Sequence, residues 1–118
     1  MSTVYVFIST GRFRSFADLQ EYIDPSYTAD GGAIPSAFMG EVGLSGYEPA
    51  CIEAIPSESG VSVRLADLLA GASFSDQWLP GLDGSRLADS AVCVFAPNLV
   101  RHPERCSLEY VGAFPYRP

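Results

Sequence analysis

The chain has 118 residues, with 14 acidic residues, seven arginines and no lysine, and its formal net charge is −7. A negative field of this kind repels phosphate backbones and anionic lipid surfaces, so we expect neither nucleic acid nor a membrane as a direct partner. Hydrophobic residues make up 47% of the sequence and charged residues 18%, which is typical of a globular protein, here expected as one domain over residues 1–118. No apolar run is long enough to cross a bilayer and no signal peptide precedes the first predicted strand, so we expect a cytoplasmic location.

The acidic excess lies in one half of the sequence. Residues 15–63 contain eight acidic residues and neither lysine nor arginine. Such a segment can speed the encounter with a basic protein, or it can simply keep the chain in solution.

The first half of the chain predicts a strand and two helices. Residues 3–9 are β-branched and aromatic on both faces, which favours a central strand. Ser15 has the position of an N-cap for a helix that ends before Pro25. One face of that helix carries Phe16, Leu19, Tyr22 and Ile23. Residues 25–34 then predict a loop that turns at Gly31 and Gly32.

A second helix is predicted from Pro35 and Ser36, with Phe38 and Val42 facing inward and Gly43 after its last turn. Residues 51–55 predict a short strand, and Pro56 at its end favours an edge position.

The second half predicts a third helix and two more strands. The helix begins at Ser62 or Val63 and stops at Gly71, and Ser73 with Asp76 indicates a capping box that would bring Phe74, Trp78 and Leu79 inward. Residues 91–96 form an apolar strand that includes Cys93 as a core residue, and residues 107–114 are expected to pair with it as a hairpin. The order β-α-α-β-α-β-β predicts an α+β fold, with a mostly antiparallel sheet of about four strands and three helices packed against it.

Few residues suggest catalysis. The one histidine, His102, lies between Arg101 and Arg105, and Cys106 four residues later does not make a dyad by itself. A solvated histidine in the loop 98–106 is the favoured interpretation, and whether that loop forms a second contact region stays open.

Carboxylates are the abundant reactive groups, and paired acids can hydrolyse glycosides or hold Mg²⁺. Here they form no D-x-D or E-x-x-E cluster, and zinc spacings and phosphate-binding glycine loops are absent from the sequence. The stretch GLSGY (43–47) also lacks the spacing of a nucleophile elbow. We therefore predict no enzyme, no cofactor and no metal site.

Tyrosines placed among carboxylates instead favour protein recognition, because tyrosine offers rigid contact area and a carboxylate pairs with a basic partner. The candidate partner-binding residues are Asp24, Tyr27, Asp30, Glu41, Tyr47 and Glu48.

Five short motifs follow one another along nearly the whole chain. They are F-x-S-F-x-D-L-x-E-Y (13–22), I-P-S-A-F (34–38), G-Y-E-P (46–49), L-L-A-G-A-S-F-S-D-Q-W (68–78) and Y-V-G-A-F-P-Y (110–116). Their order resembles the Imm22-type immunity proteins of bacterial polymorphic toxin systems. That resemblance implies a small α+β protein, encoded beside a secreted toxin, that binds and neutralises the toxin in the producing cell and its kin. It implies no catalytic residues.

The resemblance and the charge together predict a cognate toxin as the partner, bound by a monomer of this chain. A nuclease is the expected toxin class because a basic cleft that holds phosphates would attract an acidic inhibitor. Delivery of the toxin by a contact-dependent or type VI-like route is an extrapolation from the family type. Two other functions stay open: a small carboxylate-based enzyme or ligand-binding domain, with raised carboxyl pKa values in one cleft, and a chaperone or adaptor for a secreted effector, with an apolar groove.

Overall fold

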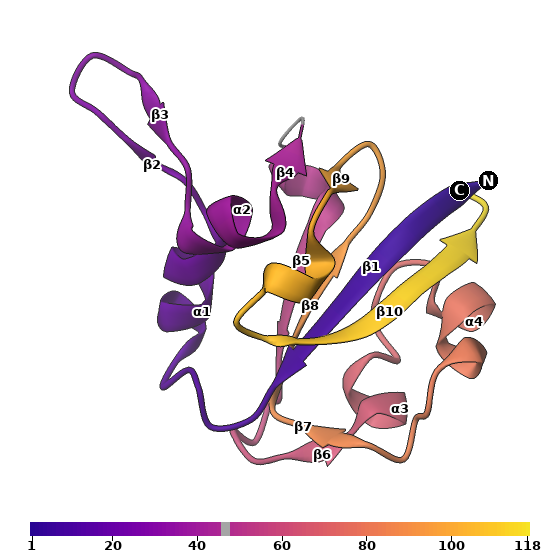
Figure 1. Ribbon diagram of the computed structural model, residues 1–118. Coiled ribbons are helices and arrows are strands. Elements are labelled where there is room, and N and C mark those ends of the chain that lie inside the picture. Colours follow the sequence, from indigo (N-terminus) through magenta and orange to yellow (C-terminus); the bar gives the residue numbers. More distant parts are fainter. Residues whose placement is uncertain (46–47) are drawn as a thin grey trace.

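The computed structural model describes residues 1–45 and 48–118 of the chain (Figure 1). Its centre is a four-stranded antiparallel sheet made of β1 (Ser2–Ser9), β5 (Ile52–Pro56), β8 (Ser90–Val94) and β10 (Glu109–Tyr116). The strands lie in the order β10-β1-β8-β5. Helices cover both faces of this sheet, and the predicted α+β class with its order of main elements is confirmed.

The central position predicted for the first strand is confirmed. β1 pairs with β8 on one side, with Tyr5 opposite Val94, and with β10 on the other, with Val4 opposite Phe114. The edge position predicted for residues 51–55 is also confirmed, because β5 pairs with β8 alone among the described strands.

The predicted hairpin between residues 91–96 and 107–114 is wrong, because β1 lies between these two strands. The connection from β8 to β10 leaves the sheet: its strand β9 (Leu99–Val100) pairs with β4 (Leu44–Ser45), and a 3₁₀ turn, η3 (Pro103–Arg105), follows. This detour carries the chain past β8, so the last strand reaches the open side of β1.

Two capped helices cover one face of the sheet. In α1 (Phe16–Ile23) the Ser15 hydroxyl accepts a hydrogen bond from the Asp18 amide, and in α2 (Ala37–Val42) Ser36 does the same for Met39. Gly43 ends α2 in the left-handed region, with a φ of 64°. These predicted boundaries are confirmed. The core beneath the helices contains Phe7, Leu19, Tyr22, Ile23, Phe38, Val42, Val92 and Val94. Phe16 is not part of it, because its position in the first turn leaves 45% of its surface exposed.

A second core fills the opposite face, under α3 (Leu65–Leu68), α4 (Ser75–Trp78) and η2 (Leu79–Gly81). Cys93, predicted as a core residue, lies here and is completely buried. The predicted helix start at Ser62 or Val63 is wrong, because β6 (Val63–Arg64) pairs with β7 (Leu87–Ala88) first.

The capping box predicted at Ser73 is also wrong. α4 begins after Phe74, which has a φ of 57° and provides no side-chain cap, and Ser73 instead donates to the Glu53 carboxylate through its amide and its hydroxyl. Trp78 is buried as predicted, whereas Phe74 remains 39% exposed.

The predicted loop 25–34 contains a small hairpin, β2 (Ser26–Tyr27) and β3 (Ala33–Ile34). In Figure 1 this hairpin projects well beyond the sheet and the helices that cover it. A further 3₁₀ turn, η1 (Pro49–Cys51), leads into β5. No helix within the described residues has the length and apolar character that a membrane crossing requires.

Candidate interaction surface

The projecting hairpin presents Tyr27 to solvent. Tyr27 lies opposite Ala33 in the hairpin register and 66% of its surface is exposed, and Ile34 on the second strand is 48% exposed. An isolated two-stranded ribbon gains little stability by itself, because it buries little apolar surface. Large side chains exposed on such a ribbon are therefore better suited to contact another molecule than to support the fold.

Hydrogen bonds at the tip of the hairpin restrain the turn and the side chain of Asp30. The Thr28 amide donates to the Gly32 carbonyl (2.8 Å), the Gly31 amide donates to the Thr28 carbonyl (3.0 Å), and the Thr28 hydroxyl donates to the Asp30 carboxylate. Gly31 has a φ of 90°, which favours glycine. The hydrogen bonds from Thr28 and from backbone amides lower the pKa of Asp30, so the tip carries a fixed negative charge at neutral pH.

Asp24 lies where the hairpin leaves α1. It is exposed, and its amide donates to the Gln20 carbonyl (2.7 Å) at the end of the helix. It lines two shallow cavities. One, of about 450 Å³, lies between α1 and the start of the hairpin and includes Glu21 and Ser26. The other, of about 360 Å³, lies between α1 and the edge strand β5. Asp24 thus lies between the hairpin and the edge strand β5, because it lines both cavities.

Glu48 is exposed, and its backbone is held by a buried side chain. The Glu48 amide donates to the Asn98 amide oxygen (2.7 Å), and the Asn98 Nδ2 donates back to the Glu48 carbonyl (3.0 Å). Asn98 is 1% exposed, and the Glu48 carboxylate accepts a bond from the Ala50 amide at the start of η1. Sequence reasoning missed Asn98. Its only signal was a polar residue directly after an apolar strand and a proline.

Glu41 has an internal role that the sequence did not predict. Its carboxylate accepts hydrogen bonds from the Tyr22 hydroxyl (2.5 Å) and from the amide and the hydroxyl of Ser107 (2.7 and 3.2 Å). Partial burial opposes its ionisation, but these hydrogen bonds outweigh burial and lower the pKa of Glu41. Glu41 thus joins α1 and α2 to the segment before β10. Its contact with a partner stays a prediction. Tyr47, the sixth predicted residue, lies outside the described residues.

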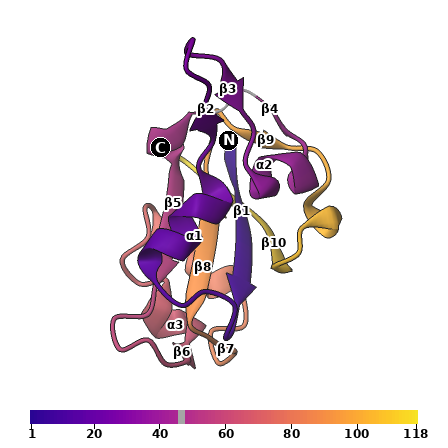
Figure 2. The same cartoon turned by 90° about the vertical axis from the view of Figure 1, so that its left-hand side faces the viewer.

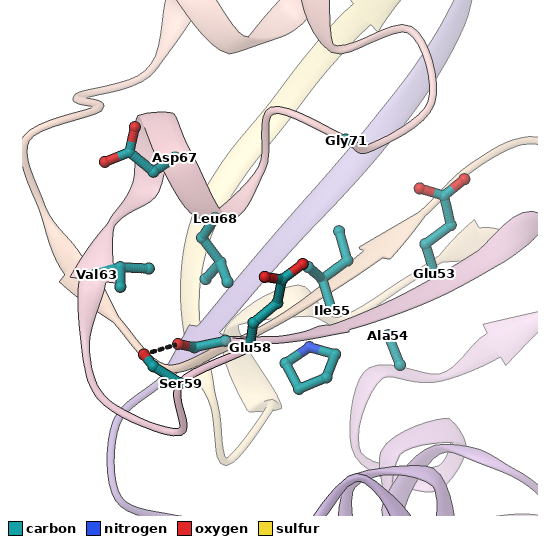
Figure 3. Close-up of a pocket in the computed structure, with 11 residues that line it drawn as sticks. Glu53, Ala54, Ile55, Glu58, Ser59, Val63, Asp67, Leu68 and Gly71 are labelled. Atoms are coloured by element: carbon teal, nitrogen blue, oxygen red, sulfur yellow. Dashed lines mark hydrogen bonds between the residues drawn. The ribbon is translucent and has the colours of Figure 1, made fainter.

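A cavity of about 770 Å³ lies beside β5, on the face of the sheet that α3 covers. Figure 3 shows the carboxylates of Glu53, Glu58 and Asp67 around it, with Ile55 and Leu68 between them. The lining contains no basic residue. The sequence did not indicate that these three acids would line one cavity, because nothing local showed that α3 would pack beside the edge strand.

The loop with His102 supports α2. The amides of Arg101 and His102 both donate to the Val42 carbonyl (3.1 and 2.8 Å), and the His102 ring packs against Gly43. The nearest carboxylate oxygen to His102 Nδ1 is that of Glu104, at 3.8 Å. Cys106 is turned toward the Tyr22 hydroxyl, and burial raises the pKa of its thiol. This arrangement closes the end of α2. Within residues 1–45 and 48–118, no cluster of histidine, cysteine or carboxylate side chains could hold a metal ion.

Comparison with known families agrees with the motif order. The model of the family described as Immunity protein 22 matches residues 6–117. Comparison with curated proteins and with solved structures gave no match. The match covers nearly the whole chain. The chain belongs to the Immunity protein 22 family, a membership that indicates toxin neutralisation.

Proposed function

We propose that this protein neutralises a secreted nuclease toxin by binding it through a surface made of the hairpin and the segment that begins at Glu48. The residues that we predict for this surface are Asp24, Tyr27, Asp30, Glu41, Tyr47 and Glu48, of which Tyr47 lies outside the described residues. The observation that carries the proposal is the exposed Tyr27 on a projecting hairpin, beside the ordered carboxylate of Asp30.

The charge of the surface supports a basic partner. The hairpin, α1, α2, η1 and β5 all come from residues 15–63, which contain no lysine or arginine. A nuclease domain that holds phosphates in a basic cleft would be attracted over several ångströms, and this attraction would raise the rate of association. The immunity protein would act in the cytoplasm as a monomer bound to one toxin, which a contact-dependent or type VI-like route delivers.

The test begins with capture of the toxin. A tagged chain is purified at low salt from the bacterium that encodes it, and the bound protein is separated and assayed on DNA and RNA with and without the added chain. We expect one stoichiometric, basic partner whose nuclease activity disappears at a one-to-one ratio. A neutralised partner with a different activity would contradict the nuclease assignment alone. A partner whose activity the chain leaves unchanged would contradict the immunity role.

A further inference from the structure

The edge strand β5 keeps part of its backbone unpaired. Across β5 and β8 the Phe95 amide donates to the Cys51 carbonyl, and the Ser57 amide donates to the Asp89 carbonyl. Hydrogen-bonding groups of an antiparallel pair alternate in direction along each strand. With Ile52 opposite Val94, the odd-numbered residues of β5 therefore bond to β8, and the even-numbered ones turn their groups outward.

Ala54 is the described residue of β5 whose outward amide and carbonyl could both bond to an added strand. The Ile52 amide already donates to the Pro49 carbonyl, and Pro56 has no amide hydrogen. Within the described residues, the outward groups that remain are the amide of Ala54 and the carbonyls of Ile52, Ala54 and Pro56. An unpaired edge of this kind is a template for an added strand. Figure 2 shows β5 at the margin of the sheet, with α1 crossing in front of its face.

Two cavities of different character flank this edge. On the α1 face, the cavity of about 360 Å³ has apolar side chains, among them Phe16 and Ile52, beside the polar side chains of Gln20 and Asp24. On the α3 face, the cavity of about 770 Å³ has an apolar floor and three carboxylates at its rim (Figure 3). Glu53 is engaged by Ser73. Among the described residues, the carboxylates of Glu58 and Asp67 have no hydrogen bond or ion pair.

Side chains of an added strand alternate between the two faces of a sheet. Those on one face would pack against Phe16 and Ile52 in the cavity beside α1, and those on the other would lie near Glu58 and Asp67. We propose that an extended segment of the toxin, with alternating apolar and basic residues, adds to the sheet along β5. This inference rests on the proposed function and extends the contact surface from Asp24 and Glu48 down the sheet margin, since Asp24 and Pro49 line the same cavity as Ala54.

A blocked hexapeptide of alternating valine and arginine tests the edge without the toxin. Titrated into ¹⁵N-labelled protein, it should shift the amide resonance of Ala54 and slow its hydrogen exchange, whereas the counterpart with glutamate in place of arginine should not. Ala54→Pro removes the outward amide and should weaken binding about tenfold, the value of one good hydrogen bond. Ala113→Pro, on the strand at the opposite margin of the sheet, is the matched control and should bind like the wild type. Equal binding of the two peptides, or shifts that avoid residues 52–56, would overturn the inference.

The toxin complex separates this inference from the proposed function. In the complex, the Ala54 amide should exchange more slowly than in the free protein, and Glu58→Gln combined with Asp67→Asn should weaken toxin binding. Neutralisation that persists with an unprotected Ala54 amide would overturn the added strand and leave the proposed function intact. Substitutions on β5 that weaken the complex, together with hairpin substitutions that do not, would place the contact on β5 and contradict the proposed hairpin surface.

Discussion

The hydroxyl of Tyr22 donates a 2.5 Å hydrogen bond to the carboxylate of Glu41, although 19 residues separate them in the chain. The same carboxylate binds Ser107, so one acid joins α1, α2 and the segment before β10. The guanidinium of Arg12 lies 4.8 Å from the centre of the Tyr22 ring and adds a cation–π contact. Burial, with hydrogen bonds to Cys106 and Glu41, keeps the pKa of Tyr22 above its usual value, so the phenol remains a donor. This network holds the base from which the hairpin projects.

Removal of the Tyr22 hydroxyl should destabilise the fold. In Tyr22→Phe the partly buried Glu41 carboxylate loses a donor, which should lower the free energy of unfolding by about 1–2 kcal/mol. Urea unfolding followed by tryptophan fluorescence measures this loss. Tyr27→Phe is the matched control, because that hydroxyl is on an exposed side chain, and its effect should stay within about 0.5 kcal/mol. Equal effects of the two substitutions would contradict a structural role for the Tyr22 hydroxyl.

The same network predicts how stability depends on pH. The pKa of Glu41 is lower in the folded protein than its ordinary value of 4.5. At pH values between the folded and the unfolded pKa, the unfolded state therefore binds more protons than the folded state. The stabilisation by the Glu41 carboxylate should therefore be complete above the unfolded pKa and be lost as the pH falls through the folded pKa. Urea unfolding of the wild type and Glu41→Gln between about pH 3 and pH 6 checks this sign. The stability difference should shrink toward low pH, and a difference that grows would contradict it.

Asn98 should matter both for stability and for the shape of the surface. Asn98→Ala removes the acceptor of the Glu48 amide and the donor to its carbonyl, and it should cost about 2–3 kcal/mol of unfolding free energy. Leu99→Ala, at an exposed neighbour, is the control and should change little. At a temperature where Asn98→Ala remains folded, its complex with the toxin should still be weaker. Unchanged toxin affinity would remove the Glu48 segment from the surface.

Tyr27 is the expected centre of the toxin contact. Tyr27→Ala should raise the Kd of the complex about 30-fold, because a tyrosine that becomes buried at an interface contributes on the order of 2 kcal/mol. Its effect on folding should be small, since the side chain is exposed. Leu87→Ala, at a residue 60% exposed on β7, provides a control of similar exposure. Isothermal titration with the captured toxin measures both, and equal Kd values for the two variants would exclude Tyr27 as an anchor.

The elements that were predicted correctly are those with local signals. Ser15, Ser36 and Gly43 fix the ends of α1 and α2 through hydrogen bonds and backbone conformation within a few residues. The apolar residues of β1 on both faces indicated its central place. The neighbour of β10 could not be predicted, because strand pairing depends on contacts distant in sequence. The four-residue helices α3 and α4 gain their stability from packing and not from propensity, so their bounds were also missed.

For the candidate surface too, local features could be predicted and contacts between distant segments could not. The composition of residues 15–63 predicts an acidic surface, which stays a prediction, and the structure places Tyr27 and Asp30 exposed on one hairpin. The sequence did not show that Tyr22 and Ser107 would donate hydrogen bonds to Glu41, nor that Glu58 and Asp67 would line the same cavity. Both arrangements depend on how α1, α2 and α3 pack, which no single segment encodes.

The most direct test of the account is the rate at which the captured toxin associates with two charge-reversal variants. Asp24→Lys with Asp30→Lys, and Asp76→Lys with Glu104→Lys, both replace two exposed carboxylates and change the net charge from −7 to −3. Stopped-flow kinetics at low salt, after thermal unfolding has shown that both variants fold, should give a rate constant about tenfold lower for the first pair and a nearly unchanged one for the second. The difference should fade at high salt. Equal rate constants for the two pairs at low salt would contradict an acidic toxin-binding surface at the hairpin.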